Sequence, residues 1–238
     1  MNNIHPTAII VGDVVLGVDN TVGANVVIHG PARIGDGNWI GTGVVIGAPP
    51  EIRSFAHPRD FVELAGRGVT IGNRNVIREY AQIHQGWKST TAVGDDAFIM
   101  NQVYVAHDCT LGDGVTLASS VLLAGHVTVG TNANLGLGTS VHQGRYIGAS
   151  AMVGMSSVVT RDIPPFAKAY GSPARVVGAN VVGMRRGGIV EEAVVALSAL
   201  YESDDGPEAL SGFSQTDGIS EAVIAWQERH GPVESTIG

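Results

Sequence analysis

The sequence predicts a parallel β-helix built from hexapeptide repeats, because aliphatic residues recur with a fixed spacing. One such residue occupies every sixth position from Val93 to Val159, from Ile4 to Ile46 and from Ile71 to Ile83, which makes 23 markers. A period of six fits neither the 3.6-residue turn of an α-helix nor plain strand alternation, but it fits one short strand and one turn per repeat. The residue four places after a marker is usually small, as at Ala97 and Cys109, so both inward positions are specified. The expected fold class is an all-β solenoid with a small α-helical tail.

The repeat frame divides the chain into two parts. Residues 1–170 are expected to form the β-helix, and residues 171–238 a crossing segment followed by a short helical region. The frame is interrupted by a long excursion at residues 48–70 and by four extra residues at 87–92. Prolines 164 and 165 lack N–H donors and are expected to end the coil. Beyond a glycine-rich crossing, apolar residues at helical spacing predict helices over residues 190–202 and 219–230.

Composition excludes several classes of protein. A net charge of −8 argues against non-specific nucleic-acid binding. The single Cys109 rules out an intrachain disulfide framework and a thiolate zinc cluster, and its inward slot indicates core packing. No run approaches the ~20 apolar residues of a transmembrane helix, and Met1 to Thr7 does not resemble a signal peptide. We therefore expect a soluble, cytoplasmic protein without a transmembrane segment.

Because one coil takes 18 residues, positions 18 apart are expected to lie one above another. His107, Gly125 and Gln143 form one column, with Gln85 below them if the second excursion leaves the coil order intact. Neighbouring columns hold His84 and His142 on one side and Asp108 and His126 on the other, so four of the eight histidines converge on one edge. Solvated corner residues would give the same pattern. A neutral imidazole beside a glycine N–H can also take a hydroxyl proton and stabilise an oxyanion, which indicates acyl transfer to a substrate nucleophile.

Several ordered motifs resemble one enzyme family. They are Ile4-His5-Pro6-Thr7-Ala8-Ile9, Ile77-Arg78-Glu79 with Ile83-His84-Gln85-Gly86, Val105-Ala106-His107-Asp108-Cys109, Leu123-Ala124-Gly125-His126-Val127, Val141-His142-Gln143 and the stretch from Gly178 to Arg186. Over roughly residues 1–187 the chain resembles the acyl-ACP:UDP-N-acetylglucosamine O-acyltransferases of lipid A biosynthesis. Single hexapeptides occur in many transferases, but the ordered set with AHDC and AGHV 18 residues apart is specific.

The resemblance implies a left-handed β-helix, a homotrimer and active sites between neighbouring subunits. It also implies that His107 is the general base, that Gly125 is the oxyanion donor and that Asp108 orients the base. The substrate-binding residues that it implies are His84, His126, His142, Gln143, Asn180, Arg185 and Arg186. An acyl group would pass from acyl-ACP or acyl-CoA to the 3-hydroxyl of UDP-N-acetylglucosamine or a related nucleotide sugar. Acyl carrier protein would be a partner, and neither a metal nor a resident cofactor is expected.

Some residues depart from the family pattern. Glu51-Ile52-Arg53-Ser54-Phe55 stands where the family usually has Gln-Asp-x-Lys-aromatic, a stretch that contacts the acyl chain. Tyr104 replaces a histidine often found three residues before the base. Arg145 occupies a slot that should be small, so either the strand bulges there or the side chain turns outward.

Three alternative functions remain open. Gly171-Ser172-Pro173-Ala174-Arg175 resembles the turn of acetyl-CoA-dependent N-acetyltransferases that act on amino-sugar nucleotides. A zinc lyase of the γ-carbonic anhydrase type resembles the fold and binds zinc with three histidines, but two of those ligands lie five residues apart, and no histidine pair here is so placed. A β-helix that only binds or scaffolds would need none of this chemistry.

Overall fold

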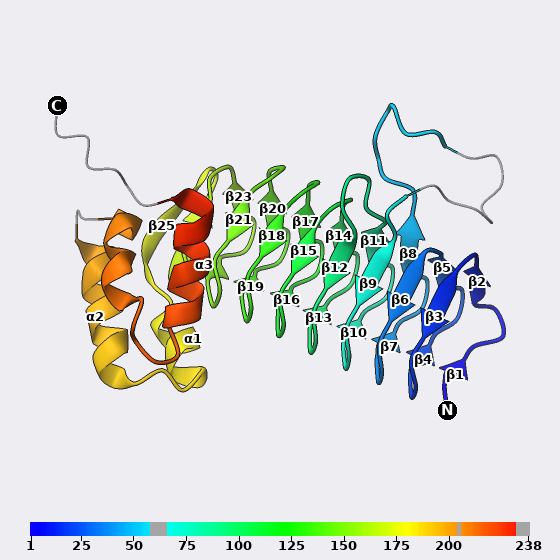
Figure 1. The fold of residues 1–238 in the computed structure, drawn as a ribbon, viewed down its shortest axis with the longest axis horizontal. Helices are drawn as coiled ribbons and strands as arrows, with labels where there is room; N and C mark the ends of the chain where they lie inside the picture. The colour runs from blue at the N-terminus through cyan, green and yellow to red at the C-terminus, as the bar shows by residue number, and fades with distance from the viewer. Residues whose placement is uncertain (58–65, 204–205, 232–238) are drawn as a thin grey trace.

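The computed structural model describes residues 1–57, 66–203 and 206–231. Figure 1 shows a long prism of stacked strands, with the N-terminus at one end and a group of helices at the other. Each coil contributes one strand to each of three sheets, here named A, B and C. The predicted parallel β-solenoid is confirmed.

The strands follow the chain around the prism in the order A, B, C. Sheet A contains β1 (Asn3–Ile4), β4 (Thr21–Val22), β7 (Trp39–Ile40), β10 (Val76–Ile77), β13 (Phe98–Ile99), β16 (Thr116–Leu117), β19 (Asn134–Leu135), β22 (Met152–Val153), β24 (Ala167–Gly171) and β25 (Ala174–Ala179). Sheet B contains β2 (Ile9–Val11), β5 (Val27–His29), β8 (Val45–Ala48), β11 (Gln82–His84), β14 (Tyr104–Val105), β17 (Leu122–Leu123), β20 (Ser140–Val141) and β23 (Val158–Val159). Sheet C contains β3 (Val14–Leu16), β6 (Ala32–Ile34), β9 (Val69–Ile71), β12 (Thr91–Val93), β15 (Thr110–Leu111), β18 (Thr128–Val129) and β21 (Tyr146–Ile147).

Each of the 23 predicted markers lies in one of the strands β1 to β23. Val105 pairs with Leu123 and Leu123 with Val141, which confirms the predicted 18-residue vertical register. Ile83 pairs with Val105, 22 residues away, so the four extra residues leave the prism and the coil order stays intact. The long excursion begins after β8 and ends before β9, and its residues 58–65 lie outside the described residues.

The interior of the prism is a continuous aliphatic core. The markers from Val22 to Val159 and the small residues between them are buried there. Cys109 is fully buried, and burial raises the pKa of its thiol to about 12, so it is an inert core residue as predicted. Strand β21, which begins directly after Arg145, keeps its register, and the Arg145 side chain is 36% exposed and lies 3.4 Å from Asp162. This result settles the two alternatives in favour of an outward side chain.

A ladder of buried asparagines runs through the N-terminal half, and the sequence analysis did not predict it. Asn38 donates to the Asn20 side chain and to the Gly72 carbonyl, and its own side-chain oxygen accepts from the backbone and side chain of Asn75. These side chains provide hydrogen bonds to backbone groups at the turns, where the strand ladder does not reach.

The C-terminal region differs in part from the prediction. Sheet A continues past the two prolines, because β24 pairs in parallel with β22. The prolines lie in the corner before β24, where the pairing of the strands needs no backbone N–H donor. Contrary to our expectation, they therefore do not end the sheet. Strands β24 and β25 then form an antiparallel hairpin in place of the expected irregular crossing, and the predicted domain boundary at residue 170 falls within it.

The helical tail closes the C-terminal end of the prism (Figure 1). It contains α1 (Val181–Arg186), α2 (Glu191–Glu202), the 3₁₀ helix η1 (Gly206–Phe213) and α3 (Ser220–His230). Helices α2 and α3 confirm the two predicted helices. A second apolar cluster that includes Phe166, Met184, Leu197 and Trp226 joins them to the last coils. None of the helices in the described residues has the length and apolar character needed to cross a bilayer.

Candidate functional site

The turns that lead from sheet B to sheet C, here called the BC corner, carry most of the predicted site residues. His84 ends strand β11, His107 and Asp108 follow β14, Gly125 and His126 follow β17, and His142 and Gln143 follow β20. Both excursions leave the prism at this corner, since each joins a sheet B strand to a sheet C strand. The predicted columns are therefore confirmed as positions on one edge of the prism.

The side chains of His107 and Asp108 meet although the two residues are neighbours in sequence. They lie in a turn where Asp108 has a φ of 61°, so the alternation of an extended strand does not apply. His107 Nδ1 lies 2.7 Å from Asp108 Oδ2. An ionised carboxylate only accepts hydrogen bonds, so Nδ1 carries the proton and Nε2 keeps its lone pair. The turn thus presents a histidine in the tautomer that a general base requires.

A loop holds the Asp108 carboxylate from its other side. Asp108 Oδ1 accepts hydrogen bonds from the backbone N–H groups of Trp87 (3.1 Å), Lys88 (2.8 Å) and Ser89 (2.6 Å), and from the Ser89 hydroxyl (3.0 Å). Burial alone would raise the pKa of Asp108, but the hydrogen bonds from Ser89, His107 and Lys88 outweigh it and lower the pKa to about 2. The four inserted residues of the second excursion thus fix the partner of His107.

Gly125 lies directly against the His107 ring. A Cβ atom placed on Gly125 would stand 2.5 Å from His107 Cε1 and 2.6 Å from Nε2, so only glycine leaves room for the ring. The Gly125 carbonyl accepts from Gly144, whereas the Gly125 N–H donates to no group among the described residues. A basic nitrogen and an unused backbone donor therefore lie next to each other.

The remaining residues of the corner surround this pair. The His126 ring meets the His107 ring edge-on at a centroid distance of 5.1 Å, and its Nε2 lies 3.7 Å from Asp108 Oδ2. His142 and Gln143 are exposed one coil further along. Gln85 is buried one coil below His107 and donates to the Gly47 carbonyl, so its position is the predicted one but its side chain supports the fold.

His84 belongs to a second cluster, which the sequence analysis did not predict. Its Nδ1 lies 2.9 Å from the Pro49 carbonyl oxygen, and its Nε2 lies 2.7 Å from Glu51 Oε1, at ion-pair distance but without hydrogen-bond geometry. The Tyr104 hydroxyl donates to the same Glu51 oxygen. Burial raises the pKa of Glu51, and the contacts with His84 and Tyr104 more than reverse this and lower it. Two residues that depart from the family pattern, Glu51 and Tyr104, thus contact each other beside the corner.

Asn180 and Arg186 lie away from the histidines, on another part of the prism. Both line a hollow of about 550 Å³ that also includes Lys168 and Asn134, and none of the described residues that line it is acidic. The Asn180 side chain caps helix α1 by accepting from Gly183 and donates to the Ser150 carbonyl. Arg185 is not part of the lining, because it pairs with Glu191 on the surface. The cationic lining fits an anionic group such as a phosphate.

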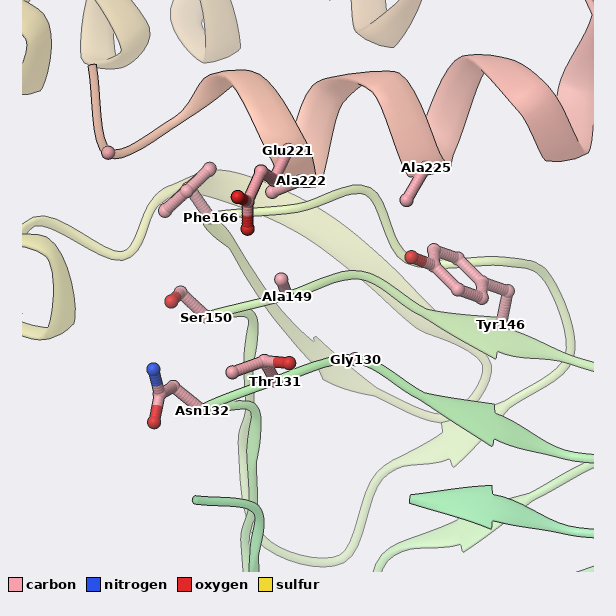
Figure 2. A pocket seen from close by; sticks show the side chains of 11 residues that line it. Gly130, Thr131, Asn132, Tyr146, Ala149, Ser150, Phe166, Glu221, Ala222 and Ala225 are labelled. Atoms are coloured by element: carbon pink, nitrogen blue, oxygen red, sulfur yellow. The ribbon is translucent and has the colours of Figure 1, made fainter. Parts of the chain in front are cut away.

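Figure 2 shows a different hollow, of about 410 Å³, between the last coils and helix α3. Thr131 and Ser150 lie on the turns from sheet C to sheet A, and Glu221 and Ala222 face them from the helix. None of the predicted site residues lines this hollow. It is therefore not a continuation of the BC corner.

Two family models match the chain. The model described as "Udp N-acetylglucosamine O-acyltransferase; Domain 2" matches residues 162–203, and the model described as "Bacterial transferase hexapeptide (six repeats)" matches residues 90–125. The first match covers β24, β25 and the first two helices, and the second covers the coils that contain His107 and Gly125.

Curated relatives match more than half of the chain. An acyl-[acyl-carrier-protein]–UDP-N-acetylglucosamine O-acyltransferase of Thermodesulfovibrio yellowstonii is 46% identical over 141 residues, which cover 57% of this chain and 54% of the relative. A Burkholderia lata protein of the same name is 40% identical over 136 residues, which cover 56% of this chain and 52% of the relative. The chain thus spans about half the length of the curated relatives that it matches.

Solved structures match over nearly the whole chain. A UDP-N-acetylglucosamine acyltransferase from Campylobacter jejuni is 32% identical, with a TM-score of 0.72, and the match covers 93% of this chain and 95% of that one. The corresponding protein of Francisella novicida is 27% identical, with a TM-score of 0.81, and the match covers 94% of this chain and 88% of that one.

Proposed function

This chain belongs to the UDP-N-acetylglucosamine O-acyltransferase family, and we propose that it transfers an acyl group from a carrier thioester to the 3-hydroxyl of UDP-N-acetylglucosamine. The observation that carries this proposal is that His107 Nε2, which keeps its lone pair, lies beside Gly125, whose N–H donates to no group among the described residues. Names of relatives supply the donor and acceptor classes, acyl-ACP and UDP-N-acetylglucosamine.

In the proposed reaction, His107 Nε2 takes the proton from the sugar hydroxyl as its oxygen attacks the thioester carbonyl. A new C–O bond forms, and the carbonyl oxygen becomes an oxyanion that accepts a hydrogen bond from the Gly125 N–H. The tetrahedral intermediate collapses with cleavage of the C–S bond, and the imidazolium returns its proton to the leaving thiolate. Asp108 keeps Nδ1 protonated throughout and stabilises the imidazolium by its negative charge.

The acceptor is proposed to bind across two subunits of a homotrimer. His84, His126, His142 and Gln143 lie at the BC corner, whereas Asn180 and Arg186 lie at a separate hollow of the same chain. One nucleotide sugar can contact both groups if the corner of one copy faces the hollow of its neighbour. In this arrangement the corner holds the sugar and the acyl group, and the cationic hollow holds the diphosphate.

Product analysis tests the proposal. The protein is incubated with UDP-N-acetylglucosamine and a series of acyl-ACP thioesters, and in parallel with acetyl-CoA and amino-sugar nucleotides. Mass spectrometry should identify a 3-O-acyl nucleotide sugar with one acyl-ACP. An N-acetylated product from acetyl-CoA would instead identify an N-acetyltransferase, and turnover of no thioester by an intact assembly would leave a binding protein.

A further inference from the structure

We infer that His107, Asp108 and His126 form a site at which Zn²⁺ binds and reversibly switches the enzyme off. Among the described residues, these three form the one set of three His, Cys, Asp or Glu ligand atoms that lie within 4.8 Å of one another. No metal is needed for the proposed reaction, so the ion acts as an inhibitor and not as a resident cofactor.

The distances of the two imidazoles from the carboxylate lie on either side of the spacing around a tetrahedral ion, and all three ligand atoms lie within 4.8 Å of one another. His107 Nδ1 lies 2.7 Å and His126 Nε2 lies 3.7 Å from Asp108 Oδ2. Ligand atoms around zinc, with bonds of about 2.0–2.1 Å, stand roughly 3.3 Å apart, which lies between these two values. Two imidazoles and one carboxylate are ligands that zinc prefers, and a water molecule would complete the coordination.

The carboxylate is also prepared for coordination by its surroundings. Oδ1 is saturated by the 87–89 loop, so Oδ2 is the oxygen that remains for a cation. The side chain of Asp108 is fully buried, whereas that of His126 is 31% exposed, so the ion can enter past the His126 ring. Hydrogen bonds that fix a ligand from behind are typical of metal centres.

Zinc at this position would block the base directly. A neutral imidazole has one lone pair, and coordination through Nδ1 uses it, so the proton moves to Nε2. Nε2 then has no lone pair with which to accept the proton of a sugar hydroxyl. The inhibition, unlike the binding, rests on the proposed role of His107 as the general base.

Cobalt spectroscopy tests the site without an activity assay. After EDTA treatment and dialysis, the full chain is titrated with Co²⁺, and the d–d absorption bands of a tetrahedral ion are followed. We expect one Co²⁺ per chain, displaced by Zn²⁺ and not by Mg²⁺, which prefers six oxygen ligands. Bands that are absent, or that show octahedral coordination only, would overturn the inference.

Variants assign the ligands. His126→Ala, His126→Gln and Asp108→Asn should each weaken Zn²⁺ binding by at least about 10- to 100-fold, the loss that changes outside the ligand set already cause, since each removes an imidazole or the carboxylate charge. The matched control is His230→Ala, because His230 Nε2 lies 3.0 Å from Asp162 Oδ2, yet these two residues belong to no set of three ligand atoms among the described residues. Its Zn²⁺ affinity should stay within about two-fold of wild type. Wild-type affinity in both His126 variants would place the ion elsewhere and refute the site.

Turnover measured with and without Zn²⁺ separates this inference from the proposed function. Inhibition that EDTA reverses, and that is lost in parallel with Co²⁺ binding, supports both. Co²⁺ binding at the three residues without inhibition would refute His107 as the base and leave the metal site standing. An active enzyme without the Co²⁺ bands would refute the metal site and leave the proposed function standing.

Discussion

At the scale of single residues, the candidate site depends on backbone geometry as much as on side-chain type. The positive φ of Asp108 brings its carboxylate beside His107, and the same left-handed conformation recurs at His126 (62°) and Gly144 (69°) in the coils above. Aspartate, histidine and glycine are among the residues that tolerate this conformation best. The turn therefore tolerates aspartate and histidine, two residue types that can also do acid–base chemistry.

The contact between Gly125 and the His107 ring leads to a first prediction. Gly125→Ala places a methyl group 2.6 Å from Nε2, so the ring must move from its position. A misplacement of about 1 Å commonly costs about 10²-fold in rate, and we expect a loss of kcat of that order. Gly212→Ala is the control, since a Cβ there meets no atom of the described residues within 4 Å. Equal turnover in the two variants would mean that Gly125 does not shape the site.

The lowered pKa of Asp108 leads to a prediction about acid stability. Because its pKa is about 2 in the folded chain and about 4 when unfolded, the ionised carboxylate stabilises the fold above pH ~4. This contribution is lost as the pH falls towards 2. Thermal melts should therefore show Asp108→Asn less stable than wild type at pH 6, with a difference in Tm that narrows below pH 4. A difference that is constant from pH 6 to pH 3 would contradict the assigned pKa.

At the scale of elements, both insertions into the solenoid serve the BC corner. The 87–89 loop binds Asp108, and the segment after β8 brings Glu51 to His84 and Tyr104. A strand repeat alone cannot bind a carboxylate with three N–H groups, because its own N–H groups are used by the next coil. The irregular segments thus provide what the regular coil lacks.

The asparagine ladder is the element whose loss should destabilise the prism. Asn38→Ala removes the hydrogen bonds that Asn38 donates to the Asn20 side chain and the Gly72 carbonyl. It also removes the acceptor of the buried Asn75 N–H. A buried group left without its hydrogen bond costs about 1–3 kcal/mol, so the free energy of unfolding should fall by an amount in that range. Denaturant unfolding measures this. The control Asn134→Ala changes an exposed strand residue, and a loss as large as that of Asn38→Ala would refute the ladder's role.

At the scale of the whole molecule, the proposed trimer predicts complementation between two damaged chains. His107→Ala damages the corner and Arg186→Ala damages the hollow, and each homotrimer should turn over slowly. In trimers mixed at equal ratio, about one quarter of the sites combine an intact corner with an intact hollow. Co-expressed chains should therefore recover activity above either parent. No recovery in verified mixed trimers would mean that the site lies within one chain.

The solenoid, its register and the histidine-rich corner could be predicted from the sequence. A six-residue period with three repeats per coil determines which residues lie one above another. The β24–β25 hairpin was not predicted, because it has no such period and its pairing is antiparallel. The contacts of Asp108 with the 87–89 loop were also missed, because backbone N–H groups are common to nearly all residue types. Glu51 and Tyr104 are 53 residues apart, and nothing in their spacing indicates that they meet.

The most direct measurement of the central claim is the turnover of His107→Ala with UDP-N-acetylglucosamine and the acyl-ACP that wild type prefers. Loss of a general base commonly costs 10²- to 10⁴-fold, which is about 3 to 5 kcal/mol of barrier. The account predicts a loss in that range, with Tm and assembly unchanged because the core residues Val105 and Leu111 are untouched. A His107→Ala rate within a factor of a few of wild type would contradict the account.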